Sequence, residues 1–259
     1  MTTIKIDHLA KSFDAEKAVL FDVNLDITPG EAITIIGPSG CGKSTLLRLI
    51  LGLIPVDQGQ VYIDNIDITK LTEVDQNRIR RKFGMVFQSA ALFDSMTVGD
   101  NVAFPLRETD QLMSESRIKR LVSEKLAMVG LPGVEDLMPS ELSGGMKKRV
   151  SFARAIIAEP DVLLYDEPTT GLDPVTSTMI EDVIIKLRQE LKITSVIVTH
   201  QPSTIFRASE RIVMLDKGRI IEVGTPEDAL TSVNPVVREF IDLGLMVCNK
   251  PLVNSKENG

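Results

Sequence analysis

The sequence lacks any apolar run that approaches the roughly 18 uninterrupted residues needed to cross a membrane as a helix. The longest apolar stretch, Leu46 to Ile54, is broken by Arg48. The first residues also lack the apolar centre of a secretory signal peptide. We therefore expect a chain that does not span a membrane by itself and carries no secretion signal.

Cysteine and clustered positive charge are also scarce. Cys41 and Cys248 are the only two cysteines, which predicts a protein of a reducing, cytosolic compartment. The chain has 29 Lys and Arg against 36 Asp and Glu, a net charge of −7, and we find no basic block. We therefore expect no nucleic-acid partner. The apolar fraction of 43% is enough for a sizeable core.

A glycine-rich segment matches the phosphate-binding pattern G-x-x-x-x-G-K-[ST]. Its residues, with the one that follows, are Gly37, Pro38, Ser39, Gly40, Cys41, Gly42, Lys43, Ser44 and Thr45. An apolar run, Ala32 to Ile36, precedes it and a predicted helix follows, so backbone N–H groups would face phosphate oxygens. Lys43 is predicted to reach the β- and γ-phosphates, and the Ser44 hydroxyl to bind Mg²⁺.

Two adjacent acids end a second apolar run, Val162 to Tyr165. Phosphoryl transfer to water needs a metal and a positioned water in addition to a phosphate cradle. We predict that Asp166 holds Mg²⁺ through water and that Glu167 polarises the attacking water. Alone, this pattern is also typical of a solvated turn after a strand, but its combination with the phosphate loop favours catalysis.

Three further segments accompany these motifs. Leu142-Ser143-Gly144-Gly145 precedes a predicted helix, and its hydroxyl, bare amides and helix dipole offer a second anion site. By itself Ser-Gly-Gly is also an ordinary helix N-cap. Gln88 and His200 each follow an apolar run. The Asn-Lys-x-Asp guanine-recognition pattern is missing, because Asn249-Lys250 is followed by Pro-Leu, so the sequence is not that of a P-loop GTPase.

With these segments, the chain resembles the ATP-binding cassette (ABC) family from about Ile4 to about Leu230. The resemblance implies an ATPase that works as a homodimer with two ATP molecules at its interface. It assigns Ser143, Gly144 and Gly145 of one subunit to the γ-phosphate bound by the other. Asp173 matches the family loop that crosses between the two sites.

The resemblance also gives roles to three residues that are weak signals alone. His200 matches the family's switch histidine, which contacts the γ-phosphate, and joins Glu167 and Lys43 as a predicted catalytic residue. Phe13 lies 30 residues before Lys43, where the family has an aromatic that stacks on adenine, although composition alone favours a core phenylalanine. Gln88 is predicted to sense Mg²⁺ and the γ-phosphate and to couple nucleotide state to a helical subdomain.

The predicted fold is α/β, a P-loop NTPase with a RecA-like parallel sheet, an N-terminal antiparallel β subdomain and an inserted α-helical subdomain. Alternation predicts antiparallel strands at Ile4–Ile6, Val19–Ile27 and Gly59–Ile63. Short apolar runs predict buried parallel strands at Ile33–Ile36, Met85–Phe87, Val162–Tyr165 and Ser195–Val198.

No strand-like run lies between Ser89 and Pro160, where helical periodicity covers Ser114–Val129 and Met146–Ala158. We therefore expect an ATPase domain over residues 1–232, with the helical subdomain at about 89–160, and a tail over 233–259.

The stretch from Phe87 to Val98, continued by Asn101 to Leu106, resembles the Mla-type (MCE-associated) phospholipid transporter ATPases and the chloroplast lipid-importer ATPase. Met146, where most importers have Gln, agrees with this. The resemblance implies integral membrane permease subunits gripped at this stretch, a lipid-binding MCE-type substrate protein, and a peripheral place on the cytoplasmic face of the inner membrane. Two alternatives stay open: the ATPase of a polar amino-acid or ion importer, and a non-transport cassette protein acting on ribosomes or DNA.

Apolar residues recur between Pro235 and Val247. They predict a helix that either packs on its own sheet or, as the resemblance implies, docks on the neighbouring subunit as a dimer clasp. We expect a chain ending at Ser232 to fold and bind ATP but to dimerise weakly, and Asn254 to Gly259 to be disordered.

Overall fold

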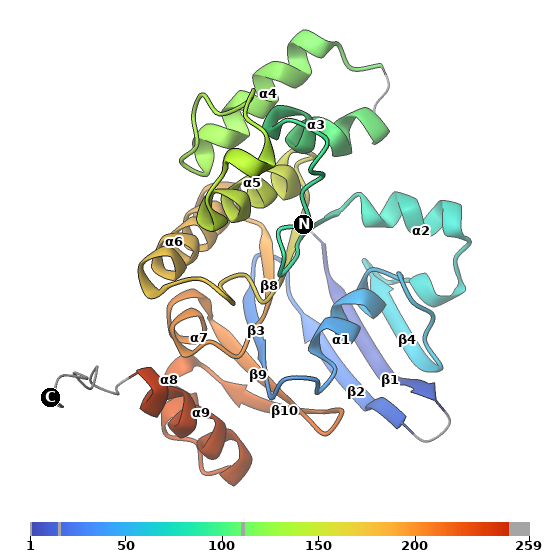
Figure 1. Cartoon of the computed structure of the whole chain (residues 1–259). Coiled ribbons are helices and arrows are strands. Elements are labelled where there is room, and N and C mark those ends of the chain that lie inside the picture. The colour runs from blue at the N-terminus through green and yellow to red at the C-terminus, as the bar shows by residue number, and fades with distance from the viewer. Residues whose placement is uncertain (1, 15–16, 110–111, 249–259) are drawn as a thin grey trace, which may run out of the picture.

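Two β-sheets organise the computed structural model, which describes residues 2–14, 17–109 and 112–248 (Figure 1). The larger sheet has six strands in the order β10-β9-β3-β8-β7-β6. Their bounds are Ala32–Ile36 for β3, Phe83–Val86 for β6, Val162–Asp166 for β7, Thr194–Val198 for β8, Arg211–Asp216 for β9 and Arg219–Gly224 for β10. All of these strands pair in parallel except β10, which is antiparallel to β9.

The smaller sheet has the order β2-β1-β4-β5 and is antiparallel. Its strands are β1 (Ile4–Asp14), β2 (Lys17–Ile27), β4 (Gln58–Ile63) and β5 (Ile66–Asp67). The predicted antiparallel subdomain is confirmed, but β1 extends well beyond Ile4–Ile6. Register shifts between β1 and β2 interrupt the strand's alternation, because each bulge moves the following side chains to the other face.

Nine α-helices and two short 3₁₀ turns occur in the described part of the chain. They are α1 (Lys43–Ile50), η1 (Ile68–Lys70), α2 (Glu73–Arg80), α3 (Val98–Thr109), α4 (Glu115–Met128), η2 (Pro139–Glu141), α5 (Gly144–Ile156), α6 (Pro174–Leu191), α7 (Pro202–Ala208), α8 (Pro226–Leu230) and α9 (Pro235–Cys248). Helices α3, α4 and α5 follow β6 and precede β7, and they form the upper block in Figure 1. The predicted inserted helical unit is therefore present in the fold.

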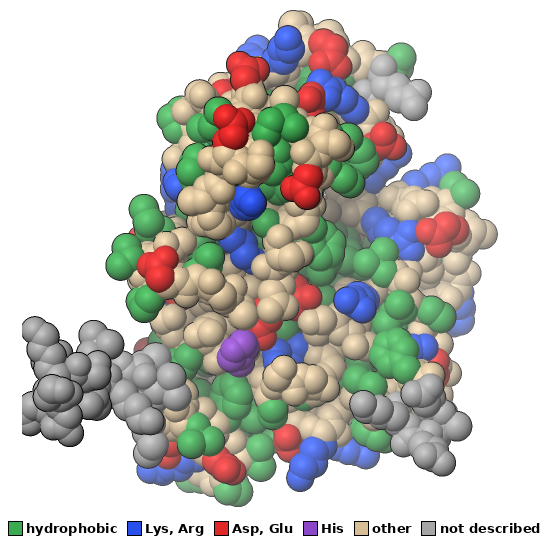
Figure 2. All heavy atoms as spheres, viewed as in Figure 1, with side chains coloured by type: hydrophobic (Ala, Val, Ile, Leu, Met, Phe, Trp, Pro, Cys, Tyr) green, Lys and Arg blue, Asp and Glu red, His purple; other side chains and the backbone are tan. Residues whose placement is uncertain are grey.

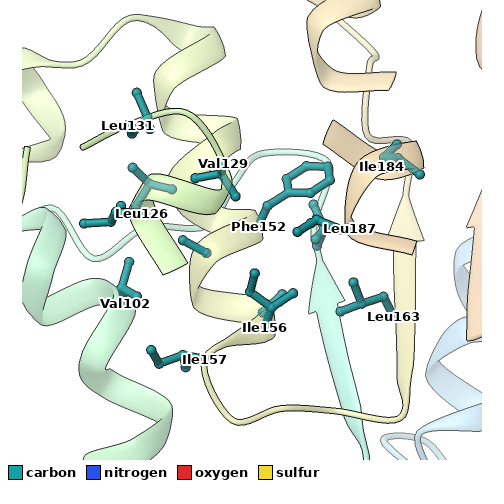
Figure 3. Packing of buried hydrophobic residues seen from close by; sticks show 14 of the residues in the cluster. Val102, Leu126, Val129, Leu131, Phe152, Ile156, Ile157, Leu163, Ile184 and Leu187 are labelled. Atoms are coloured by element: carbon teal, nitrogen blue, oxygen red, sulfur yellow. The ribbon is translucent and has the colours of Figure 1, made fainter. Parts of the chain in front are cut away.

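A hydrophobic cluster joins this helical block to the larger sheet (Figure 3). Phe152 and Ile156 of α5 lie between the block's own helices and Leu163 of β7. The Phe152 ring packs against the Tyr165 ring, with centroids 5.5 Å apart. Because α5 contributes to both sides of this cluster, it is the element that fixes the block to the sheet.

The strand predictions need two corrections. Strand β6 ends at Val86, so Phe87 lies outside the strand that was predicted to include it. The pair β9 and β10 was not predicted, and it adds two strands to the larger sheet. These strands meet in a tight turn at Lys217 and Gly218, both with positive φ (45° and 75°), which is the backbone of a two-residue hairpin.

Helix α9 packs against its own domain. Val237 and Ile241 are buried in a cluster with Ile36, Ile205 and Ile212. Leu243, on the same helix, is 57% exposed. The helix predicted over this segment is thus confirmed, whereas the predicted disordered end, residues 254–259, lies outside the described residues.

In the described part of the chain, no helix is both long enough and apolar enough to cross a membrane.

Candidate functional site

The carboxyl ends of four parallel strands surround one pocket of about 420 Å³. The parallel pairing of β3, β8, β7 and β6 places these ends at the same edge of the sheet. The pocket is lined by Phe13, Val19, Ser39, Gly40, Gly42, Lys43, Ser44, Thr45, Gln88, Glu167 and His200. Figure 2 shows acidic, basic and histidine side chains together near the middle of this face, below the helical block. The structure therefore brings together most residues predicted for nucleotide binding.

The phosphate loop requires glycine at two of its positions. A Cβ on Gly37 would lie 2.3 Å from the carbonyl oxygen of Leu215, on neighbouring β9. Gly42 has φ +109°, and a Cβ there would lie 2.9 Å from Val19. Gly42 is also the N-cap of α1, which has neither a side-chain cap nor an acid in its first turn. The first N–H groups of α1 thus remain accessible to an anion.

Lys43 and Ser44 occupy the base of this pocket. The Lys43 Nζ is buried and donates to the carbonyls of Gly37 (2.8 Å) and Pro38 (3.0 Å). The Ser44 hydroxyl donates to Asp166 Oδ1 over 2.7 Å. A hydroxyl oxygen and a carboxylate oxygen are thus adjacent beside the helix N-terminus, and oxygen ligands of this kind suit Mg²⁺.

The Glu167 carboxylate is held by contacts from several directions. Its Oε2 accepts from the hydroxyls of Thr170 (2.9 Å) and Thr199 (3.3 Å), and its Oε1 accepts from His200 Nδ1 (2.9 Å). Lys43 Nζ lies 3.8 Å from Oε1. Glu167 also has φ 50°, a backbone conformation that is rare for a residue with a side chain and is often found at functional sites. These contacts fix the carboxylate at the pocket wall.

Phe13, Gln88 and His200 line the pocket with exposed side chains, which places them at its rim. Phe13 is 56% exposed, and the buried Lys11 ammonium lies 5.6 Å from its ring centroid. The exposed side chain of Phe13 does not belong to the core, so the alternative of a core phenylalanine is wrong. Its open ring face is suitable for stacking on a base.

Ser143, Gly144 and Gly145 do not line this pocket, at least among the residues that the structure describes. Ser143 is the N-cap of α5 and accepts from the Met146 N–H over 3.2 Å. A Cβ on Gly145 would lie 2.6 Å from Thr176 Cγ2, near the start of α6. Asp173 caps that same helix by accepting from the N–H groups of Val175 and Thr176 (3.0 Å each).

The Ser143 segment and the Asp173 loop of one chain are therefore neighbours. The hydrogen bonds from Thr176 and Val175 lower the pKa of the Asp173 carboxyl below its usual range. Asp173 is thus ionised at neutral pH, and its loop lies next to Gly144 and Gly145, which follow the exposed Ser143.

Lys148 is a residue near the site that sequence reasoning missed. It lies on α5, is only 4% exposed, and its Nζ donates to the Phe87 carbonyl over 3.0 Å. Burial lowers the pKa of Lys148 to about 8, and the nearby Asp166 and Glu167 carboxylates oppose this shift. The available signal was helical periodicity, because Lys148 shares a face with the buried Ser151, Phe152 and Ala155.

This fold and pocket define a P-loop ATPase. The family model described as ABC transporter matches residues 20–170. The chain is similar to the chloroplastic protein TRIGALACTOSYLDIACYLGLYCEROL 3 of Arabidopsis thaliana, with 48% identity over 89% of this chain and 70% of that protein. It is similar to MlaF of Haemophilus influenzae, described as an intermembrane phospholipid transport system ATP-binding protein, with 40% identity over 89% of this chain and 87% of MlaF.

Among solved structures, the dimeric post-hydrolysis state of the ATP-binding cassette MJ0796 bound to ADP and Pi is similar, with a TM-score of 0.79. That likeness has 36% sequence identity and covers 86% of this chain and 98% of MJ0796. The chain belongs to the ABC transporter family, and it is an ATP-binding, ATP-hydrolysing subunit.

Replacing Glu167 with Gln tests the site directly. The variant keeps the phosphate loop and the size of the side chain, so ATP affinity should stay within about threefold of the parent value. Loss of the carboxylate should lower the rate of phosphate release by about 100-fold or more and trap an ATP-bound dimer. Lys43→Ala should instead lose ATP binding. Equilibrium ATP binding and steady-state phosphate release measure the two effects.

Glu190→Gln, at an exposed position near the end of α6, is the matched control and should keep the parent rate. A Glu167→Gln variant that releases phosphate as fast as this control would remove Glu167 from the catalytic role.

Proposed function

We propose that this chain drives an ABC transporter that moves phospholipid between membranes. The main support is the similarity to MlaF, which extends over 89% of this chain and 87% of MlaF and therefore includes almost the whole of both proteins. The name of the Arabidopsis relative, which refers to a galactolipid, agrees with a lipid cargo. The polar amino-acid or ion importer and the non-transport cassette protein are the alternatives that the experiment below distinguishes.

In the proposed reaction, ATP lies in the pocket with its adenine on Phe13 and its phosphates along the phosphate loop. Ser44, Asp166 and Gln88 would hold Mg²⁺, which supplies positive charge to the phosphate oxygens. Glu167 polarises the attacking water, and its contacts with Thr170 and Thr199 orient it for this step. His200 contacts the γ-phosphate from the rim.

The active form in this proposal is a homodimer. Ser143, Gly144 and Gly145 of each subunit complete the ATP site of the other, because these residues are exposed or half-buried and lie outside the pocket of their own chain. Asp173 is adjacent to them through Thr176. One continuous surface of each chain would then meet the partner's nucleotide, with Asp173 crossing between the two sites.

The proposed permease contact lies at the edge of the helical block. A cavity of about 820 Å³ lies between α2 and α3, and Pro105, Leu106 and Met113 contribute its apolar wall. Figure 2 shows hydrophobic side chains in the hollow between the helical block and the lobe that carries α2. Phe93 is 42% exposed, and its ring packs on Phe104, next to Pro105. A helix of an integral membrane subunit would fit this surface from the cytoplasmic side, and a lipid-binding MCE-type protein would complete the assembly.

Co-purification identifies the partner and the cargo. The tagged full-length chain, extracted from its native membrane in detergent, should retain an integral membrane protein together with phospholipid. Phe93→Glu should lower recovery of that partner at least about tenfold while ATP binding is unchanged, because a carboxylate in an apolar contact is left without a partner. Leu230→Glu, at a 51% exposed position on α8, is the control and should retain the partner.

Recovery of a permease with a bound amino acid or ion would overturn the lipid cargo. Recovery of ribosomes or DNA in place of a membrane protein would overturn the transporter function.

A mixture of two inactive chains tests the shared site. Lys43→Ala inactivates the phosphate loop of one chain. Gly144→Asp inactivates the Ser143 segment of the other chain as an anion site. A Cβ at Gly144 would have only Leu172 within 4 Å, at 3.9 Å, and the position is exposed, so the variant should fold normally. The mixture can form one intact ATP site per dimer, so we expect ATP-dependent dimers by sedimentation in the mixture and none with either chain alone.

A chain with both substitutions is the control, because no dimer of that chain contains an intact site. Equal dimerisation of this control and the mixture would mean that the Ser143 segment does not act on the partner's ATP.

We further propose that residues 1–232 form the ATPase domain and that the tail, residues 233–259, stabilises the dimer. Because α9 buries Val237 and Ile241 in its own domain, the expectation that a chain ending at Ser232 folds like the parent needs revision. Burial of two such side chains contributes about 3–6 kcal/mol, so this truncation should lower the free energy of unfolding as well as weaken dimerisation.

A chain ending at Cys248 keeps α9, so it should fold normally yet dimerise more weakly than the parent without nucleotide. Sedimentation and thermal unfolding of both truncations measure this; identical self-association of the parent and the Cys248 chain would contradict the clasp.

A further inference from the structure

The segment that carries Gln88 is tied to α5 through its backbone carbonyls. Lys148 Nζ donates to the Phe87 carbonyl over 3.0 Å, directly before Gln88. Arg154, farther along α5, donates to the carbonyls of Ala90 (2.8 Å) and Ala91 (2.7 Å). Two cationic side chains of α5 therefore donate to backbone carbonyls of three of the five residues from Phe87 to Ala91.

The shape of this segment explains why the Ala90 and Ala91 carbonyls need side-chain donors, whereas the Phe87 carbonyl accepts from both Lys148 and the Ala90 N–H (3.2 Å). Ala90 and Ala91 have φ values of 61° and 50°, so two successive residues adopt the left-handed conformation. Such a turn cannot continue a strand or a helix, and its carbonyls need other donors. Asn101 of α3 holds the far end by accepting from the Phe93 N–H (2.7 Å) and donating to its carbonyl (3.0 Å). The segment is thus attached to the helical block at both ends.

The chemistry of Lys148 is unusual for a residue that only packs. A buried ammonium is costly unless it is paired and hydrogen-bonded. Lys148 is 4% exposed, yet the hydrogen bond recorded for its Nζ goes to a neutral carbonyl. The Asp166 and Glu167 carboxylates lie near enough to compensate its charge, yet the hydrogen bond of Nζ goes to the Phe87 carbonyl and not to either acid. The position of that carbonyl, one residue before Gln88, points to a role at the ATP site.

We propose that Lys148 is a positioning residue for ATP hydrolysis, which fixes Gln88 through the Phe87 carbonyl and makes Gln88 move together with the helix that begins at Ser143. The proposal rests on the roles of Gln88 and Ser143 given above. In a dimer, Gln88 acts on its own subunit's ATP and Ser143 acts on the partner's ATP. Lys148, between the two on one rigid helix, therefore links the geometry of the two ATP sites.

Lys148→Met tests this in the full-length chain, because Met fills a similar volume and cannot donate a hydrogen bond. We expect kcat for ATP hydrolysis to fall about tenfold, as expected for loss of one charged hydrogen bond, while the KM for ATP stays within about twofold. Lys148→Gln, whose amide can donate to the same carbonyl, should restore most of the rate. Lys147→Met, at the more accessible neighbouring position, is the matched control and should keep the parent kcat.

A double-mutant cycle with Gln88→Ala shows whether Lys148 acts through Gln88. Gln88→Ala alone should lower kcat, and adding Lys148→Met should then lower it by less than twofold. If Lys148→Met lowers kcat about tenfold in both backgrounds, or Lys148→Gln is as slow as Lys148→Met, the positioning role is wrong. If Gln88→Ala has no effect on kcat, the proposed role of Gln88 itself fails, which distinguishes the two hypotheses.

Thermal unfolding of each variant separates this role from a loss of structure. Lys148→Met removes positive charge near the buried Asp166 and Glu167 carboxylates, so we expect it to unfold at or below the parent temperature while it stays folded at the temperature of the assay. If Lys148→Met is unfolded at the temperature of the assay, the positioning role is tested by comparing kcat of Lys148→Gln with kcat of the parent. A folded Lys148→Gln chain with the parent kcat supports the positioning role of Lys148, and a folded Lys148→Gln chain with a low kcat overturns it.

Discussion

The parallel hydrogen-bond pairing of β3, β8, β7 and β6 is the constraint on which the rest of this molecule depends. Parallel strands end at one edge, so the residues that follow them converge, although they are far apart in the sequence. The phosphate loop follows β3, Glu167 follows β7, His200 follows β8 and Gln88 follows β6. A change of register in any of these pairs would move one of these groups away from the pocket.

Helix α5 connects this edge of the sheet to the remainder of the protein. Its first residues form the Ser143 segment, its middle holds the carbonyls of the Gln88 segment, and its Phe152 packs on Tyr165 of β7. Well-packed interiors shift between discrete arrangements rather than deform continuously. A movement of Gln88 is therefore expected to move the whole helix, and with it the α3 surface proposed to contact a permease.

The site holds buried charge close together. Lys43 is 3.8 Å from Glu167, and the Lys148 ammonium is near Asp166 and Glu167. Burial of charges is costly in folding, and apolar replacements are often neutral or stabilising. Under the proposed function, Lys43 and Glu167 act on phosphate and water and Lys148 positions Gln88, which would account for these buried charges at a cost in stability. The same trade-off explains the left-handed backbone at Glu167.

The sequence by itself determined the phosphate loop, the acids after Tyr165, the parallel strands β3, β6, β7 and β8, and the helical insertion, but not β9 or β10. Each of these follows from local rules: glycine where the backbone approaches closely, apolar runs for strands covered on both faces, and a period of 3.6 for helices. The family resemblance already implied that the Ser143 segment acts away from its own pocket. Only the tertiary structure decided that this segment lies beside the Asp173 helix, and that α9 packs on its own domain. It alone revealed Lys148, since a lysine on a helix is usually solvated, and its burial depends on how α5 packs against β7 and the Gln88 segment.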